Sequence, residues 1–195
     1  MKKVALLCLT LLLVTGNLFA QKSVCFYGVD FSLTKVRGCD ETVEDFQRAF
    51  YGINELFMSQ SDKFDVGKFL LCQPKVSDLS IGAMSGAELH TENSFGGVNP
   101  LLTMDWAYSC EEQIPQAIKN YKLQQTEGEG LVIFGNLLDK LGQRGSFCVV
   151  TFDIATREVT SQVWIQGNPS GFGLRNYWAN SLHRAMKMYS KFVKK

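Results

Sequence analysis

The chain has 195 residues, of which 46% are hydrophobic and 20% are charged, and its formal net charge is +1 at pH 7. This length suits one domain with a buried core, and the near-zero charge gives no electrostatic basis for binding nucleic acid or an anionic membrane surface.

The first twenty residues have the pattern of a secretory signal peptide. Lys2 and Lys3 precede an apolar run over residues 4–14, and Ala20 is a small residue at a plausible cleavage point. The run is too short for a membrane span, and no cysteine follows small residues at its end, as a lipid anchor requires. We therefore expect residues 21–195 to form a single domain that is periplasmic or secreted, without stable membrane insertion.

Cleavage would leave five cysteines: Cys25, Cys39, Cys72, Cys110 and Cys148. The odd number leaves at least one of them unpaired within the chain. Cys25 and Cys148 lie in apolar runs, where a free thiol acts as a small hydrophobic side chain. We expect mostly buried thiols, with the disulfide pairing left open, and no Cys–His spacing indicates a metal site.

The amino-terminal part predicts a strand followed by a helix. Residues 24–31 are rich in β-branched and aromatic side chains, which is typical of a strand. Thr42 and Asp45 have the spacing of a capping box, and apolar residues then recur at helical spacing, which predicts a helix over about 43–59. A short strand is expected within residues 75–80.

The middle of the chain begins with a long glycine-rich loop, expected at residues 81–100. Residues 101–108 are apolar and predict a strand, and residues 111–123 have one apolar face and predict a helix. The apolar run 131–134 predicts a central strand buried on both faces, and residues 136–141 predict a helical turn.

The carboxyl-terminal part predicts an antiparallel hairpin of strands 146–154 and 158–166, and then a closing helix over 174–193 with one apolar stripe. Helices alternate with strands along the chain. The predicted fold class is therefore α/β, with a mixed β-sheet of about five strands layered with three main helices.

Two aspartates are candidates for acid–base chemistry. Asp30 and Asp153 each lie near the end of an apolar strand. Two carboxylates several ångströms apart would suit a small hydrolase, whereas an aspartate at a strand end also suits the capping of a turn. The acid pair is one alternative for the function.

The loop 167–173 before the closing helix is a candidate ligand site. Gly171 and Gly173 allow backbone N–H groups to approach a ligand, the helix N-terminus favours an anion, and Ser170 and Arg175 add polar groups. The loop is not a P-loop, because no Lys-Ser/Thr pair follows the glycines. An ordinary turn, with positive φ at both glycines and the arginine paired with a carboxylate, explains the same residues.

Four segments resemble a family of uncharacterised exported proteins of Bacteroidetes: YGVDFS at 27–32, GLVIFGNLLDK at 130–140, CVVTFDIATREV at 148–159 and GFGLRNYWANS at 171–181. The resemblance spans most of the mature chain and implies no particular activity.

A looser likeness concerns the order of strand, Asp-containing turn, strand and closing helix. It is similar to the amino-terminal domain of TolB, the curli-secretion lipoproteins and the lipoprotein activators of peptidoglycan synthases. These are α/β domains that bind proteins in envelope assembly. This chain departs from them in lacking a lipid anchor and a glycine after Thr156.

Together these features favour a non-enzymatic envelope protein that binds a protein or glycan partner, without a cofactor. A small hydrolase and an anion or small-ligand binder at the 167–173 loop are the alternatives. Convergence of Asp30, Asp153 and Arg175 in one pocket would favour these alternatives.

Overall fold

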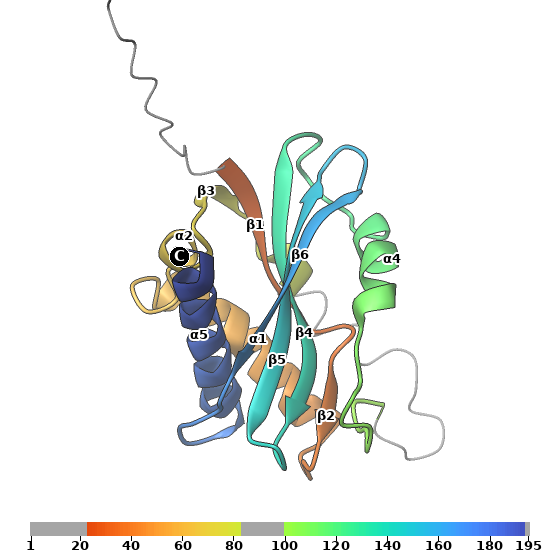
Figure 1. Ribbon diagram of the computed structural model, residues 1–195, viewed down its shortest axis with the longest axis vertical. Helices are drawn as coiled ribbons and strands as arrows, with labels where there is room; N and C mark the ends of the chain where they lie inside the picture. Colours follow the sequence, from red (N-terminus) through yellow and green to blue (C-terminus); the bar gives the residue numbers. More distant parts are fainter. Residues whose placement is uncertain (1–22, 83–99, 194–195) are drawn as a thin grey trace, which may run out of the picture.

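The computed structural model describes residues 23–82 and 100–193, so the signal-like segment 1–20 and most of the expected 81–100 loop lie outside the described residues. The described chain forms a six-stranded mixed sheet with helices on both of its faces (Figure 1). This architecture confirms the predicted α/β class, with one strand more than expected. Within the described residues, no helix combines the length and apolar character needed to cross a membrane.

The sheet has the strand order β3-β1-β4-β5-β6, with β2 also paired to β4. Its strands are β1 (Ser23–Asp30), β2 (Lys35–Arg37), β3 (Gln73–Ser77), β4 (Glu129–Asp139), β5 (Arg144–Asp153) and β6 (Val159–Gly167). Strands β1 and β2 run parallel to β4, one along its first half and the other along its second half. Strands β5 and β6 continue as an antiparallel meander, which confirms the predicted hairpin.

Helices α1 (Val43–Ser59), α2 (Val66–Leu70) and α5 (Leu174–Val193) cover one face of the sheet (Figure 1). Helix α1 has the predicted bounds, and Thr42 and Asp45 form the predicted capping box. Its phenylalanines pack on those of β1 and the residue after it, with Phe50 stacked on Phe31 at 3.9 Å between ring centroids. The closing helix α5 also has the predicted bounds.

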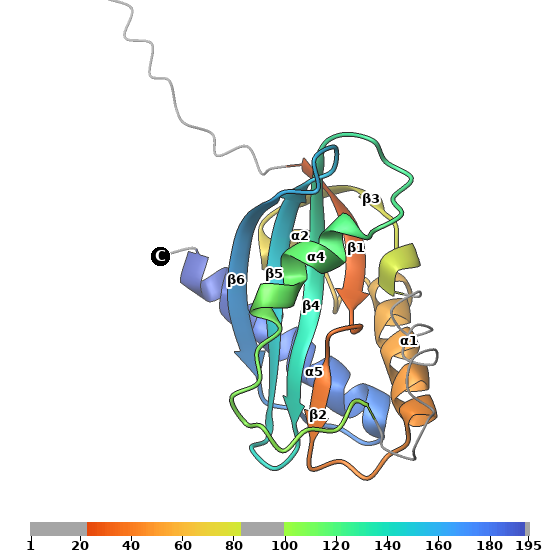
Figure 2. The same ribbon diagram turned by 90° about the vertical axis from the view of Figure 1, so that its right-hand side faces the viewer.

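The opposite face is covered by the short helix η1 (Glu111–Gln113) and by α4 (Ile114–Lys119), which crosses in front of the strands in Figure 2. Ile114 and Ile118 are fully buried in the hydrophobic core between these helices and the sheet. The helix predicted to continue to residue 123 ends at Lys119. Its last turn is closed by short-range bonds from the N–H of Asn120, and Tyr121 then turns its hydroxyl toward the sheet.

Two predictions for the middle of the chain are wrong. Residues 101–108 form no full strand, because only Leu102 bridges to β2, through Val36. Residues 136–141 form no helical turn, because β4 extends through Asp139 to pair with β2. The polar side chains in this part of β4 form hydrogen bonds with neighbouring segments, so these residues are accommodated within the strand.

The five cysteines of the described residues are all buried, as predicted, and each is a free thiol in the structure. Burial raises the pKa of four of them to between about 11 and about 12: Cys39, Cys72, Cys110 and Cys148. The thiols therefore serve as apolar packing groups.

Candidate binding cavity at the β6–α5 loop

Asp30 is a buried structural carboxylate. The residue is only 2% exposed, and its carboxylate accepts hydrogen bonds from the Tyr121 hydroxyl at 2.5 Å and from the Ser32 N–H at 2.8 Å. Burial raises the pKa of Asp30, and the bonds from Tyr121 and Ser32 oppose that effect. The carboxyl group thus fastens the chain after α4 to the end of β1.

Asp153 caps the turn of the β5–β6 hairpin. Its carboxylate accepts the N–H of Thr156 at 2.8 Å, and this bond lowers the pKa of Asp153. Along β4, Asp30 lies opposite Phe134 and Asp153 lies opposite Glu129, so the two aspartates are about 17 Å apart along the strand direction. The structure does not bring the candidate acid pair together.

The β6–α5 loop is fastened to α5 by a row of polar side chains. Four α5 residues, Asn176, Asn180, Ser181 and Arg184, donate to the loop carbonyls of Phe172, Ser170, Gly167 and Asn168, at 2.5–3.2 Å. The four residues lie at helical spacing in the sequence, and this spacing is the signal that could have indicated the contacts with the loop. They hold the loop backbone in place.

The two candidate glycines of this loop adopt the left-handed backbone expected of a turn. Gly171 has φ 101° and Gly173 has φ 79°, a region that side-chain-bearing residues rarely adopt. Phe172, between them, is 94% exposed. The loop therefore presents an aromatic side chain to solvent from a backbone that is fixed on both sides.

Arg175 points away from the candidate site. Its guanidinium donates to Asn176 Oδ1 at 3.0 and 3.1 Å, rather than to a carboxylate. Its stem lies over α1, where a Cβ added at Gly52 would come within 2.7 Å of Arg175 Cδ. Asp30, Asp153 and Arg175 thus lie in three separate places.

A cavity of about 220 Å³ lies beside the loop, at the end of the sheet where three connections meet. Its walls come from the β2–α1 connection, the β4–β5 turn and the start of α5; they are Glu41, Lys140, Gly171, Gly173, Leu174, Tyr177 and Trp178. Lys140 Nζ pairs with Glu41 Oε1 at 3.4 Å, and this carboxylate raises the pKa of Lys140. Ser170 and Arg175 are not among the wall residues.

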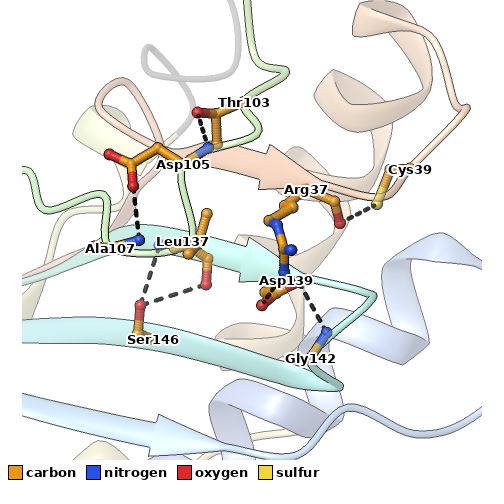
Figure 3. A network of polar contacts seen from close by, with 9 residues as sticks. All are labelled: Arg37, Cys39, Thr103, Asp105, Ala107, Leu137, Asp139, Gly142 and Ser146. Atoms are coloured by element: carbon orange, nitrogen blue, oxygen red, sulfur yellow. Dashed lines mark hydrogen bonds and ion pairs between the residues drawn. The ribbon is translucent and has the colours of Figure 1, made fainter.

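The wall that carries Lys140 is held by the partly buried ion pair of Figure 3. Arg37 Nη1 bonds both carboxylate oxygens of Asp139 at 3.1 Å, and Asp139 Oδ1 accepts the Gly142 N–H at 2.9 Å. The Lys140 N–H also donates to the Arg37 carbonyl at 2.9 Å. These bonds fix the β4–β5 turn against β2.

The described part of the chain holds no group of three or more His, Cys, Asp or Glu residues that could bind a metal ion. His183 packs between the rings of Phe64 and Phe69, and burial lowers its pKa to about 4. The other histidine, His90, lies outside the described residues.

No family model matches the chain, and no curated protein or solved structure shows a significant match to it. The resemblances to exported Bacteroidetes proteins and to the TolB amino-terminal domain therefore stay predictions.

Proposed function

We propose that this chain is an exported, non-enzymatic envelope protein that binds a protein partner at the cavity beside the β6–α5 loop. The observation that carries the proposal is Phe172, which is 94% exposed on a backbone held by the α5 side chains. A fixed, exposed aromatic side chain is typical of an interface anchor, because little conformational freedom is lost when it is buried.

The size of the cavity favours one side chain of a protein partner over a whole small molecule or a glycan. Its volume of about 220 Å³ suits one bulky side chain, whereas small-molecule pockets usually exceed about 300 Å³. Tyr177, Trp178 and Leu174 give it apolar walls, and Leu141, next to Lys140, is 61% exposed. A glycan would need polar groups for its hydroxyls, but the charged groups here, Lys140 and Glu41, already bond each other.

The geometry gives less support to the two alternatives. A hydrolase acid pair would need Asp30 and Asp153 to converge, and they lie far apart in the β4 register. For anion binding at the loop, the nearby cations are already engaged, because Lys140 in the cavity wall pairs with Glu41 and Arg175 is turned toward α1.

Site-specific crosslinking in the organism of origin would test the proposal. Phe172 is replaced by a photo-crosslinking phenylalanine analogue, and the same analogue at Met58, which is 66% exposed on α1, is the matched control. We expect one discrete crosslinked protein from position 172, competed by the unmodified chain but not by its Phe172→Ala variant. Equal crosslinking patterns at positions 172 and 58 would contradict the proposal.

A further inference from the structure

The outer edge of β6 lacks the usual protection over Ser161–Gly167. Natural sheets guard their edges with prolines, charged residues, bulges or short strands. The other edge of this sheet follows that rule, since β3 (Gln73–Ser77) has five residues and contains Pro74 and Lys75. The β6 sequence VTSQVWIQG contains neither a proline nor a charged residue.

Most of β6 keeps a regular geometry that a further strand would match. Its one irregularity falls at Thr160, and the stretch from Ser161 to Gly167 pairs residue by residue with β5. In the described chain no other strand pairs with the outer side of β6, which bounds the sheet in Figure 2. Backbone groups along this side are therefore in position to accept an added strand.

The α5 side of this edge is basic. Helix α5 (Leu174–Val193) contains no acidic residue, and Arg184 and Lys191 lie two turns apart on it, both exposed. Arg184 is placed at the end of β6 by its bond to the Asn168 carbonyl at 2.9 Å. A strand added here would meet positive charge on this face.

The same face offers a recess next to the edge that is lined by both apolar and polar side chains, with Glu129 of β4 among the polar ones. A cavity of about 210 Å³ extends across the sheet under α5, and its β6 wall is formed by Ser161 and Val163, with Tyr189 from α5. On the opposite face, Trp164 is 37% exposed. Side chains of an added strand alternate between these two faces.

We propose that β6 binds an extended acidic segment of a partner protein by antiparallel strand addition. The backbone of the segment would pair with Ser161–Gly167, its acidic and aliphatic side chains would face α5, and its uncharged side chains would lie beside Trp164. A second copy of this chain is a poorer occupant, because a two-fold axis at this edge would bring the basic α5 helices of both copies to the same side of a joined sheet.

A blocked synthetic peptide as long as Ser161–Gly167 tests the proposal with the full mature protein. Glutamate and valine occupy its α5-facing positions and threonine the others. We expect saturable binding by calorimetry and slower amide hydrogen exchange in β6. N-methylation of alternate backbone nitrogens, or replacement of glutamate by lysine, should each weaken binding at least tenfold.

Matched variants separate this edge from other surfaces. Arg184→Glu combined with Lys191→Glu should weaken binding of the acidic peptide at least tenfold, while Lys119→Glu on α4 and Phe172→Ala should leave it unchanged. Equal binding of the methylated and unmethylated peptides, no binding, or a β6-mediated dimer in sedimentation would each overturn the proposal. Because Phe172→Ala leaves this binding intact, failure here is distinct from failure at the cavity.

Discussion

The buried amide of Asn54 joins α1 to the backbone of β1 beside an irregularity in that strand, and its loss offers a direct test of how the two layers are joined. The residue is 3% exposed on α1; its Oδ1 accepts the Val29 N–H at 2.8 Å, and its Nδ2 donates to the Val29 carbonyl at 2.9 Å. The pairing of β1 with β4 shifts register between Phe26 and Val29, and Gly28 has φ 84°. The amide thus satisfies both backbone groups of Val29, beside the irregularity in the pairing of β1 with β4.

Substitution of Asn54 by leucine keeps the number and branching of the side-chain heavy atoms but removes both hydrogen bonds. Each buried backbone group left without a partner costs about 1–3 kcal/mol, so the free energy of unfolding should fall by about 2–6 kcal/mol. The total stability of a domain is usually about 5–15 kcal/mol, so this loss is a large fraction of it.

Equilibrium unfolding in urea measures this loss as a lower midpoint at an unchanged slope. Met58→Ala, at a position 66% exposed on the same helix, is the control and should change stability by less than about 0.5 kcal/mol. A loss below about 1 kcal/mol for Asn54→Leu would refute the reasoning, since the backbone groups of Val29 would then not depend on the amide.

Further predictions concern titration, thiol reactivity and processing. Because burial raises the pKa of Asp30, its contribution to stability is present below pH 3.8 and is lost as the pH rises above it; Asp30→Asn should abolish this part of the pH dependence in urea unfolding. His183 has the opposite sign: its pKa is lowered from 6.5 to about 4, so stability should fall as the pH drops through this window, and His183→Gln should flatten that fall. Alkylation followed by mass spectrometry should find the five thiols protected in the native protein and reactive after denaturation, and rapid native labelling would contradict their burial. Amino-terminal sequencing of the exported protein should begin at Gln21, and an uncleaved chain in the cytoplasm would contradict export.

The elements that the sequence predicted well are those whose pattern is local. The apolar stripe and the capping box set the bounds of α1, and the alternating strands around a tight turn set the β5–β6 hairpin. The helix predicted over 111–123 was too long because Tyr121 continues its apolar spacing, whereas in the structure its hydroxyl bonds Asp30 at the end of β1.

The candidate site depended on contacts between distant residues, which no local pattern reveals. Residues 136–141 look like a helical turn, but β4 extends to Asp139, where Arg37, remote in sequence, satisfies the carboxylate. Predictions for the 167–173 loop identified its glycines and their backbone conformation, but placed Arg175 in the site. The polar row on α5 from Asn176 to Arg184 is a helical signal that would have indicated a tethered loop.

The parallel pairing of β1 and β2 with β4 has a consequence for the order of folding. Residue Cys25 lies opposite Gly130 and Lys35 opposite Leu137, so each of these pairs closes a very long stretch of chain. During synthesis the chain emerges amino-terminus first. Strand β1 and helix α1 therefore lack their central strand until β4 has been synthesised. The meander from β4 to α5 is contiguous and has short connections, so it can form as soon as it emerges. The carboxyl-terminal part would then fold first, and the amino-terminal part would dock onto it.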